Sequence, residues 1–272
     1  IDPLSFQRFY GGLGRDVPLV SIEARPHPVE IRYRPARGNH PEDIIDAVSG
    51  AITSIARGSA EGDVLSFLSG QGAIHRVVEQ LYRRGVGRHA EILPLFGALP
   101  WEEQERVFAA IDKRKIIVAT NIAETSITVP GIRYVVDSGR AKVPRVDPRT
   151  GVRALREEGI SQASADQRTG RAGRTAPGVA IRLYSRRDYD KRPRFLDEEI
   201  IRLDLREVVL RLIDLGIRDI EEFAFPTPPS RRRLDDAVRQ LQDMKAVTKD
   251  RELTGIGKRM VVFPLSPPLA RM

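Results

Sequence analysis

The sequence predicts an α/β fold in which a parallel β-sheet carries helices on both faces and is followed by a small, mostly helical domain. Short runs rich in Val, Ile and Leu are typical of buried parallel strands, and amphipathic segments stand between these runs. Strands that alternate with helices favour a parallel sheet, because each crossover helix covers one of its faces. Near residue 195 the pattern changes to long helical periodicity, which indicates a second domain.

Five apolar runs are the expected strands, and they occupy residues 63–68, 90–96, 115–120, 132–137 and 179–185. A helix is expected over 41–58, since a proline stands in its first turn and a glycine at its end. Two further amphipathic helices are expected between the strands. Their apolar residues are Ile74, Val77, Val78 and Leu81 in the first, and Trp101, Val107, Phe108 and Ile111 in the second.

The expected domain organisation has four parts. Residues 1–38 form an extended leading segment, 39–194 the α/β domain, 195–265 the helical domain, and 266–272 the start of a further helical domain. Inside the α/β domain, the turn-forming "DPRTG" between two basic stretches predicts a β-hairpin near 142–156. Two or three helices followed by a small β-element predict that the helical domain is a winged helix.

The composition limits the class of protein. The chain of 272 residues is 41% apolar and 30% charged, which is ordinary for a folded globular protein. No stretch approaches the roughly 18 apolar residues that span a bilayer, so no membrane partner is expected. The absence of cysteine excludes disulfides and thiolate metal sites and fits a cytoplasmic location. With only 4 histidines as well, no metal site is expected in this chain.

The net charge of +8 is concentrated in one segment. From residue 140 to residue 194 fifteen Lys and Arg stand against six Asp and Glu, so the rest of the chain is close to neutral. Such a segment attracts polyanions, of which nucleic acids are the commonest. Within it "DQRTGRAGRT" (166–175) places Arg168, Arg171 and Arg174 at every third position. On a helix this spacing predicts one positive edge that faces an anionic partner.

Four segments resemble, in order and spacing, motifs of the superfamily 2 helicases. "FLSGQGAI" (67–74) resembles motif IV of the DEAH-box branch, "ATNIAETSITVPGIRYVVDSG" (119–139) its motif V, and "QRTGRAGR" (167–174) its motif VI. "ILPLFGALPWEEQERVF" (92–108) falls where this branch has its Leu-Pro-Leu and Gln-x-x-x-Phe segment. The likeness extends over essentially the whole chain and points, within this branch, to the bacterial HrpA-type RNA helicases.

The resemblance implies a RecA-like fold for the α/β domain and the activity of an ATP-dependent RNA helicase. The sequence contains neither the G-x-x-x-x-G-K-[ST] phosphate loop nor the D-E-x-H strand of such enzymes. Both belong to a first RecA-like domain, so this chain is expected to be the second RecA-like domain with its winged helix. ATP with Mg²⁺ is the implied cofactor, and the Mg²⁺ ligands are expected on the first domain. The expected partners are that domain and single-stranded or partly duplex RNA, and the fragment alone is expected to hydrolyse no ATP.

The same resemblance assigns the site residues one by one. The catalytic residues are Gln167, Arg171 and Arg174; the glutamine orients the attacking water, and the arginines are fingers that stabilise charge on the γ-phosphate. The nucleotide-binding residues are Ser126, Thr128, Phe108 and, together with a role at the domain interface, Arg168. The RNA-binding residues are Ser69, Gly70, Thr120 and Asn121, which contact phosphates and therefore carry no base information.

Other classes of protein stay open at this point. One is a nucleic-acid-binding module in which the winged helix binds and the arginines contact phosphates of DNA or RNA. Another is an interaction scaffold with a degenerate helicase fold, against which the intact Gln167, Arg171 and Arg174 argue. A DNA helicase is a nearer alternative, because contacts to the RNA 2′-hydroxyl leave no readable motif.

Overall fold

The computed structural model describes residues 3–20, 27–58, 61–125, 129–146, 153–202 and 204–272. The chain divides into two compact units. The α/β unit lies within residues 21–143 and 156–196, and the helical unit lies within residues 1–20, 144–155 and 197–272.

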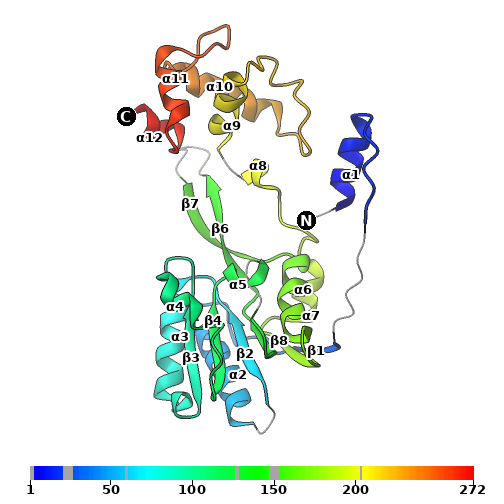
Figure 1. The fold of residues 1–272 in the computed structure, drawn as a ribbon, viewed down its shortest axis with the longest axis vertical. Helices are drawn as coiled ribbons and strands as arrows, with labels where there is room; N and C mark the ends of the chain where they lie inside the picture. Colours follow the sequence, from blue (N-terminus) through cyan, green and yellow to red (C-terminus); the bar gives the residue numbers. More distant parts are fainter. Residues whose placement is uncertain (1–2, 21–26, 59–60, 126–128, 147–152, 203) are drawn as a thin grey trace. The chain divides into compact units, whose positions relative to one another are not determined.

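A six-stranded sheet forms the centre of the α/β unit, and all of its strand pairs are parallel (Figure 1). The strands, in their order across the sheet, are β1 (Val29–Tyr33), β8 (Gly178–Arg182), β5 (Ile132–Asp137), β2 (Asp63–Phe67), β4 (Arg114–Ala119) and β3 (Ala90–Leu95). Among the described residues of this unit, the helices are α2 (Pro41–Arg57), α3 (Gln71–Arg83), α4 (Trp101–Glu105), α5 (Ile122–Thr125), α6 (Gln162–Gly170) and α7 (Arg186–Lys191), with 3₁₀-helices η1 (Val86–Arg88) and η2 (Arg171–Gly173).

Both faces of the sheet are buried, which explains the continuous apolar runs of the sequence. Along β4, Ile116 and Val118 pack in the core beneath α2 and α3. The alternate residues Ile117 and Ala119 pack in a second core with Ala172 of η2. The predicted α/β fold, a parallel sheet with helices on both faces, is therefore confirmed.

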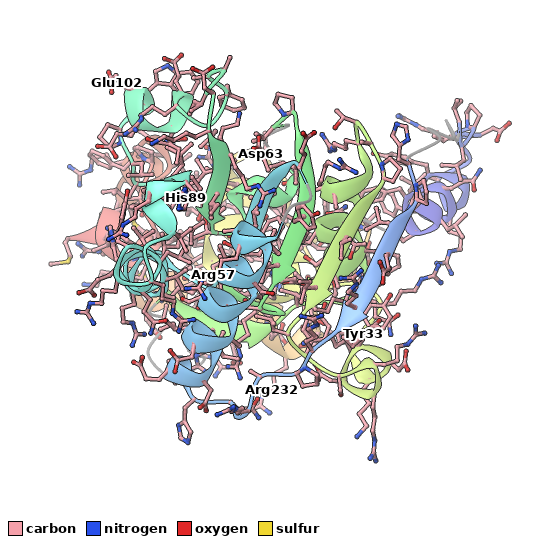
Figure 2. All side chains as sticks on the ribbon, turned by 90° about the horizontal axis from the view of Figure 1, so that it is seen from below. Tyr33, Arg57, Asp63, His89, Glu102 and Arg232 are labelled. Atoms are coloured by element: carbon pink, nitrogen blue, oxygen red, sulfur yellow. The ribbon has the colours of Figure 1, made fainter. Side chains whose placement is uncertain are left out.

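Tyr33 and Asp63 mark the two ends of the strands. Tyr33 ends β1 and Asp63 begins β2, and because the strands are parallel the two residues lie at opposite ends of the sheet along the strand direction (Figure 2). Burial raises the pKa of Asp63, although hydrogen bonding and charge from Lys115 oppose this rise. Asp63 therefore lies where the strands begin, and Tyr33 lies where they end.

A two-stranded sheet of β6 (Arg140–Val146) and β7 (Arg153–Gly159) corresponds to the hairpin expected near 142–156. The loop that the sequence predicts between these strands, 147–152, lies outside the described residues. The described parts of the hairpin are divided between the two units.

The described residues of the helical unit include the helices α1 (Pro3–Gly12), α8 (Glu199–Arg202), α9 (Leu205–Asp214), α10 (Arg231–Asp243), α11 (Gly255–Val262) and α12 (Pro267–Arg271). Residues of α9, α10 and α11 share one apolar core, in which Val209, Leu241 and Met260 are buried. Between α10 and α11, Val247 and Leu253 form an isolated antiparallel β-bridge. Among the described residues, none of the helices combines the length and the apolar character that crossing a bilayer needs.

Three expectations about single elements were wrong. The leading segment 1–38 is not extended throughout, since Pro3–Gly12 is helical; Val29–Tyr33 is extended, as a strand that pairs with β8. The helix expected over 101–111 ends at Glu105, so the chain leaves the helix before Phe108. The long helical periodicity after residue 195 does not form one helix, since the Asp204 side chain accepts a hydrogen bond from Arg206 N and thereby begins a new helix, α9.

Candidate functional site

The residues predicted to bind RNA phosphates lie at the carboxyl ends of two neighbouring strands. Ser69 and Gly70 follow β2, whereas Thr120 and Asn121 follow β4. β2 and β4 are paired in parallel, and Leu68 N donates to Ala119 O over 2.8 Å just before the two segments begin. The four residues therefore stand at one edge of the sheet, where open α/β sheets commonly bind their ligands.

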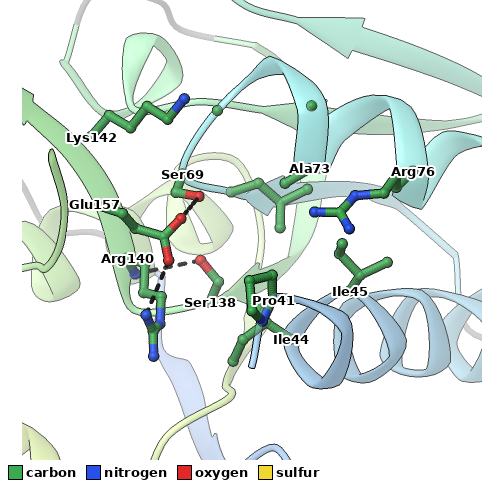
Figure 3. Close-up of a pocket in the computed structure, with 13 residues that line it drawn as sticks. Pro41, Ile44, Ile45, Ser69, Ala73, Arg76, Ser138, Arg140, Lys142 and Glu157 are labelled. Atoms are coloured by element: carbon green, nitrogen blue, oxygen red, sulfur yellow. Dashed lines mark hydrogen bonds and ion pairs between the residues drawn. The ribbon is translucent and has the colours of Figure 1, made fainter. Parts of the chain in front are cut away.

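A cavity of about 210 Å³ lies beside Ser69 and Gly70 (Figure 3). Its wall includes Ser138, Arg140, Lys142 and Glu157. Lys142 passes over Gly70, and a Cβ atom at Gly70 would lie 2.9 Å from Lys142 Cε. Because Gly70 has no side chain, Lys142 can lie against the start of α3.

The motif VI segment forms α6 and η2, but its three arginines do not share one exposed edge. Arg168 is 0% exposed, Arg171 is 6% exposed, and Arg174 is exposed. The expectation of one positive edge was therefore wrong. An α-helix turns by about 100° per residue, so positions i and i+6 lie about 120° apart around the axis. Gln167 lies on the exposed side of α6.

Arg168 is enclosed by acidic side chains inside the α/β unit. Its Nε donates to Glu124 Oε2 over 2.9 Å, and its Nη1 donates to Asp137 Oδ1 over 2.7 Å. Its guanidinium lies over the Phe67 ring, 4.8 Å from the ring centroid. Burial alone lowers the pKa of Arg168, but the charges of Asp137 and Glu124 outweigh it and raise this pKa above the usual value. The Arg168 guanidinium is thus buried against Glu124 and Asp137, and its contact with the nucleotide stays a prediction.

Glu124 joins motif V to motif VI through both its main chain and its side chain. Its main-chain oxygen accepts a hydrogen bond from Arg171 Nη2. Its carboxylate accepts hydrogen bonds from Arg168 Nε and from Ser164 Oγ. The orientation of Arg171 therefore depends on the same segment that, at Thr120 and Asn121, carries candidate RNA contacts.

The sequence reasoning missed Glu124 and Asp137. The sequence does contain a signal for Asp137. This acidic residue directly follows the apolar pair Val135 and Val136 at the end of a strand, so its carboxylate is expected to be buried. A buried carboxylate needs a cation or several donors, and an arginine in motif VI was the available cation. Asp166, the acidic residue directly before motif VI, pairs with Arg182 over 2.7 Å.

Arg171 and Arg174 lie close enough to repel each other. Burial lowers the pKa of Arg171, the charge of Arg174 lowers it further, and Glu124 opposes the change. Two neighbouring guanidinium groups are stabilised by an anion placed between or beside them. The residues present thus fit a polyphosphate at η2. Among the described residues, no group of three or more His, Asp or Glu side chains could hold a metal ion.

The remaining nucleotide-binding predictions divide into two kinds. Phe108 is 44% exposed, so its ring is available for a ligand and is not a core aromatic. Ser126 and Thr128 lie outside the described residues.

Comparison with known protein families identifies the class. Residues 45–176 match the helicase conserved C-terminal domain, and residues 237–265 match the winged-helix helicase associated domain (HA2). The first match covers the strands β2 to β5 and motifs IV to VI, whereas β1 and β8 lie outside it; the second match covers the second half of α10 and all of α11. A helicase C-terminal domain followed by a winged helix is the class that this fold defines.

Three known helicases are similar to the chain over most or all of its length. The chain is 42% identical over 280 residues to the ATP-dependent RNA helicase HrpA of Escherichia coli (strain K12). This match covers 100% of this chain and 21% of that protein. It is 38% identical over 264 residues to the probable ATP-dependent RNA helicase DHX35 of Homo sapiens, covering 93% of this chain and 37% of that protein. The crystal structure of the Escherichia coli DEAH/RHA helicase HrpB matches with a TM-score of 0.88 and 36% identity, over 100% of this chain and 34% of that chain.

The chain belongs to the DEAH-box superfamily 2 helicases, of the HrpA type. It spans about a fifth to somewhat over a third of the length of these relatives.

Proposed function

We propose that this chain is the C-terminal helicase portion of an ATP-dependent RNA helicase and that it supplies arginine fingers and RNA-backbone contacts. The observation that carries the proposal is the position of Arg171, whose Nη2 donates to the main-chain oxygen of Glu124 while its neighbour Arg174 is exposed. The backbone contact fixes the Arg171 guanidinium, and the two neighbouring arginines, Arg171 and Arg174, are suited to bind an anion.

The nucleotide would be shared with a first RecA-like domain. ATP supplies the γ-phosphate, and that domain would supply the phosphate loop and the Mg²⁺ ligands that this sequence does not contain. From this chain, Arg171 and Arg174 would stabilise the charge that develops during hydrolysis, and Gln167 would orient the attacking water. Phe108 would stack on the base. Residues 1–272 alone would consequently hydrolyse no ATP.

RNA would be held by its backbone at the carboxyl edge of the sheet. Ser69 offers a hydroxyl, Asn121 an amide, and Gly70 and Thr120 approach through main chain and hydroxyl. Contacts to phosphate are independent of base sequence. The hairpin of β6 and β7 would act as a wedge at a duplex junction.

Movement along RNA would follow from a cycle of domain closure. With ATP bound, the arginines would draw this chain toward the first RecA-like domain, and hydrolysis would release that contact. Because Glu124 contacts Arg171 from the segment that also carries Asn121, a change at the nucleotide would be transmitted to the RNA contacts.

The test is ATP hydrolysis by the full-length protein with and without single-stranded RNA, for the unaltered protein and for Arg171→Ala. We expect RNA-stimulated turnover to fall by about a hundredfold, which equals about 2.7 kcal/mol of transition-state stabilisation, with RNA affinity retained. The matched control is Arg187→Ala, which removes an exposed arginine of α7 and should leave turnover unchanged. Unchanged hydrolysis with weakened RNA binding in Arg171→Ala would favour a non-catalytic nucleic-acid-binding module, and stimulation by DNA but not RNA would favour a DNA helicase.

A further inference from the structure

Glu157 stands where an RNA phosphate is expected. Its Oε2 accepts the hydroxyl hydrogen of Ser69, one of the candidate RNA-binding residues (Figure 3). Its Oε1 accepts from Arg140 Nη1 over 3.0 Å. Glu157 belongs to β7 and Ser69 follows β2, so the contact joins segments far apart in the chain.

A carboxylate and a phosphodiester are bound by the same kinds of hydrogen-bond donor. Both present anionic oxygens that accept hydrogen bonds from hydroxyl and guanidinium groups. Ser69 has a single hydroxyl hydrogen to donate, so it serves either Glu157 or a phosphate, but not both.

The surroundings of Glu157 attract a second anion. Lys142 lines the same cavity, is exposed, and makes no hydrogen bond or ion pair with the described part of the chain. Arg140 lines the cavity as well, and the 13-residue helix α3 begins beside it with Gly70 as its N-cap. The amino end of a helix carries a partial positive charge.

We propose that Glu157 is an internal competitor of the RNA backbone: its carboxylate occupies the Ser69 hydroxyl and the Arg140 guanidinium until an RNA phosphate displaces it. This inference rests on the proposed function, because it takes Ser69 as an RNA contact. Glu157 is thereby a residue that sets RNA affinity. It also links the hairpin to RNA binding, since the contact that RNA breaks is made by a hairpin strand.

The experiment measures binding of a fluorescein-labelled oligouridine by the full-length protein, using fluorescence anisotropy. Glu157→Gln removes the charge and keeps the shape of the side chain, and we expect it to tighten RNA binding by about fivefold, the scale of a partly exposed ion pair. Glu158→Gln is the matched control, because it makes the same change in net charge on the next residue of β7, whose side chain points to the other face of the strand. We expect no comparable gain from this control.

A second pair of variants tests whether the competition concerns Ser69. In a Ser69→Ala background only the Arg140 guanidinium is left to compete for, so Glu157→Gln should give a smaller gain than it gives with Ser69 present. Equal gains from Glu157→Gln and Glu158→Gln, or the full gain retained without Ser69, would overturn the inference while leaving the proposed function intact. Failure of the unaltered protein to bind RNA would overturn the proposed function itself, and this inference with it.

Discussion

Arg168 Nη1 donates to Asp137 Oδ1 over 2.7 Å, with the two side chains 0% and 2% exposed. The second carboxylate oxygen of Asp137 accepts from the Tyr184 hydroxyl over 2.9 Å, and Gly139 N donates to Oδ1 over 2.9 Å. Burial, followed by the charge of Asp137, raises the pKa of Tyr184, so its hydroxyl remains a donor. The end of β5 is thus joined to α6 by a buried and well-bonded ion pair.

We expect Asp137→Asn to destabilise the α/β unit by about 3–5 kcal/mol, because it leaves the buried Arg168 charge with half of its compensation. Urea denaturation of the chain measures this loss. Asp190→Asn is the control, since Asp190 pairs with Arg186 at the surface and should lose no more than about 1 kcal/mol. Similar losses in both variants would mean that the buried pair contributes no more than a surface pair.

We expect Gly173→Ala to destabilise the chain and Gly170→Ala to be tolerated, although both glycines belong to motif VI. A Cβ atom at Gly173 would lie 2.6 Å from the main-chain oxygen of His27, whereas one at Gly170 would meet nothing within 4 Å. Overpacking against backbone costs about 1–3 kcal/mol. Thermal unfolding compares the two variants directly, and equal melting temperatures would contradict the packing of η2 against residue 27.

We expect Phe108→Ala to raise the KM of the full-length protein for ATP with little loss of stability. A stacked base is worth about 1–3 kcal/mol, which corresponds to roughly a fivefold to 160-fold change. Trp101→Ala removes another exposed aromatic residue, 66% exposed against 44% for Phe108, and should leave the KM unchanged. A large loss of stability without a change in KM would place Phe108 in the fold and not at the nucleotide.

We expect Glu221→Gln to remove a pH-dependent part of the stability of the helical unit. Arg251 Nη1 donates to Glu221 Oε2 over 2.6 Å, and hydrogen bonding from Arg251 lowers the pKa of Glu221. Because this pKa is lower in the folded chain, the stabilisation is complete above about pH 5 and is lost as the pH falls through the folded-state value. The partly exposed pair is screened by solvent, so about 0.5–1 kcal/mol is expected at pH 7.

Urea denaturation at pH 7 and at pH 3 measures the effect for Glu221→Gln against the charge-matched Glu222→Gln. The difference between the two variants should be present at pH 7 and shrink at pH 3. A difference that grows on acidification would contradict the lowered pKa.

The main sheet could be predicted because each of its central strands is buried on both faces. Ile116, Ile117 and Val118 illustrate this: adjacent residues enter opposite cores, so the strand appears in the sequence as an unbroken apolar run. β1 carries no such run, since Ile31 at the sheet edge is 41% exposed, and its place depends on pairing with distant β8.

The site could be predicted only as far as local spacing determines it. Ser69 and Thr120 stand at neighbouring strand ends, which follows from a parallel sheet. Arg168 could not be distinguished from Arg171 by spacing, because its burial depends on Asp137 and Glu124, which lie 31 and 44 residues away in the sequence. Glu157 was missed for the same reason, since its contact with Ser69 spans 88 residues.

The position of β1 has a consequence for synthesis on the ribosome. Among the described strands β1 pairs with β8 alone, and Tyr33 stands opposite Arg182, 149 residues later. At about 5–20 residues per second, a nascent chain waits roughly 7–30 s before the partner of β1 has been made. Until then the β8-facing edge of β5 is open as well, and an open strand edge recruits other chains. Slow translation before residue 178 should therefore favour aggregation, and holding chaperones would be needed most during that interval.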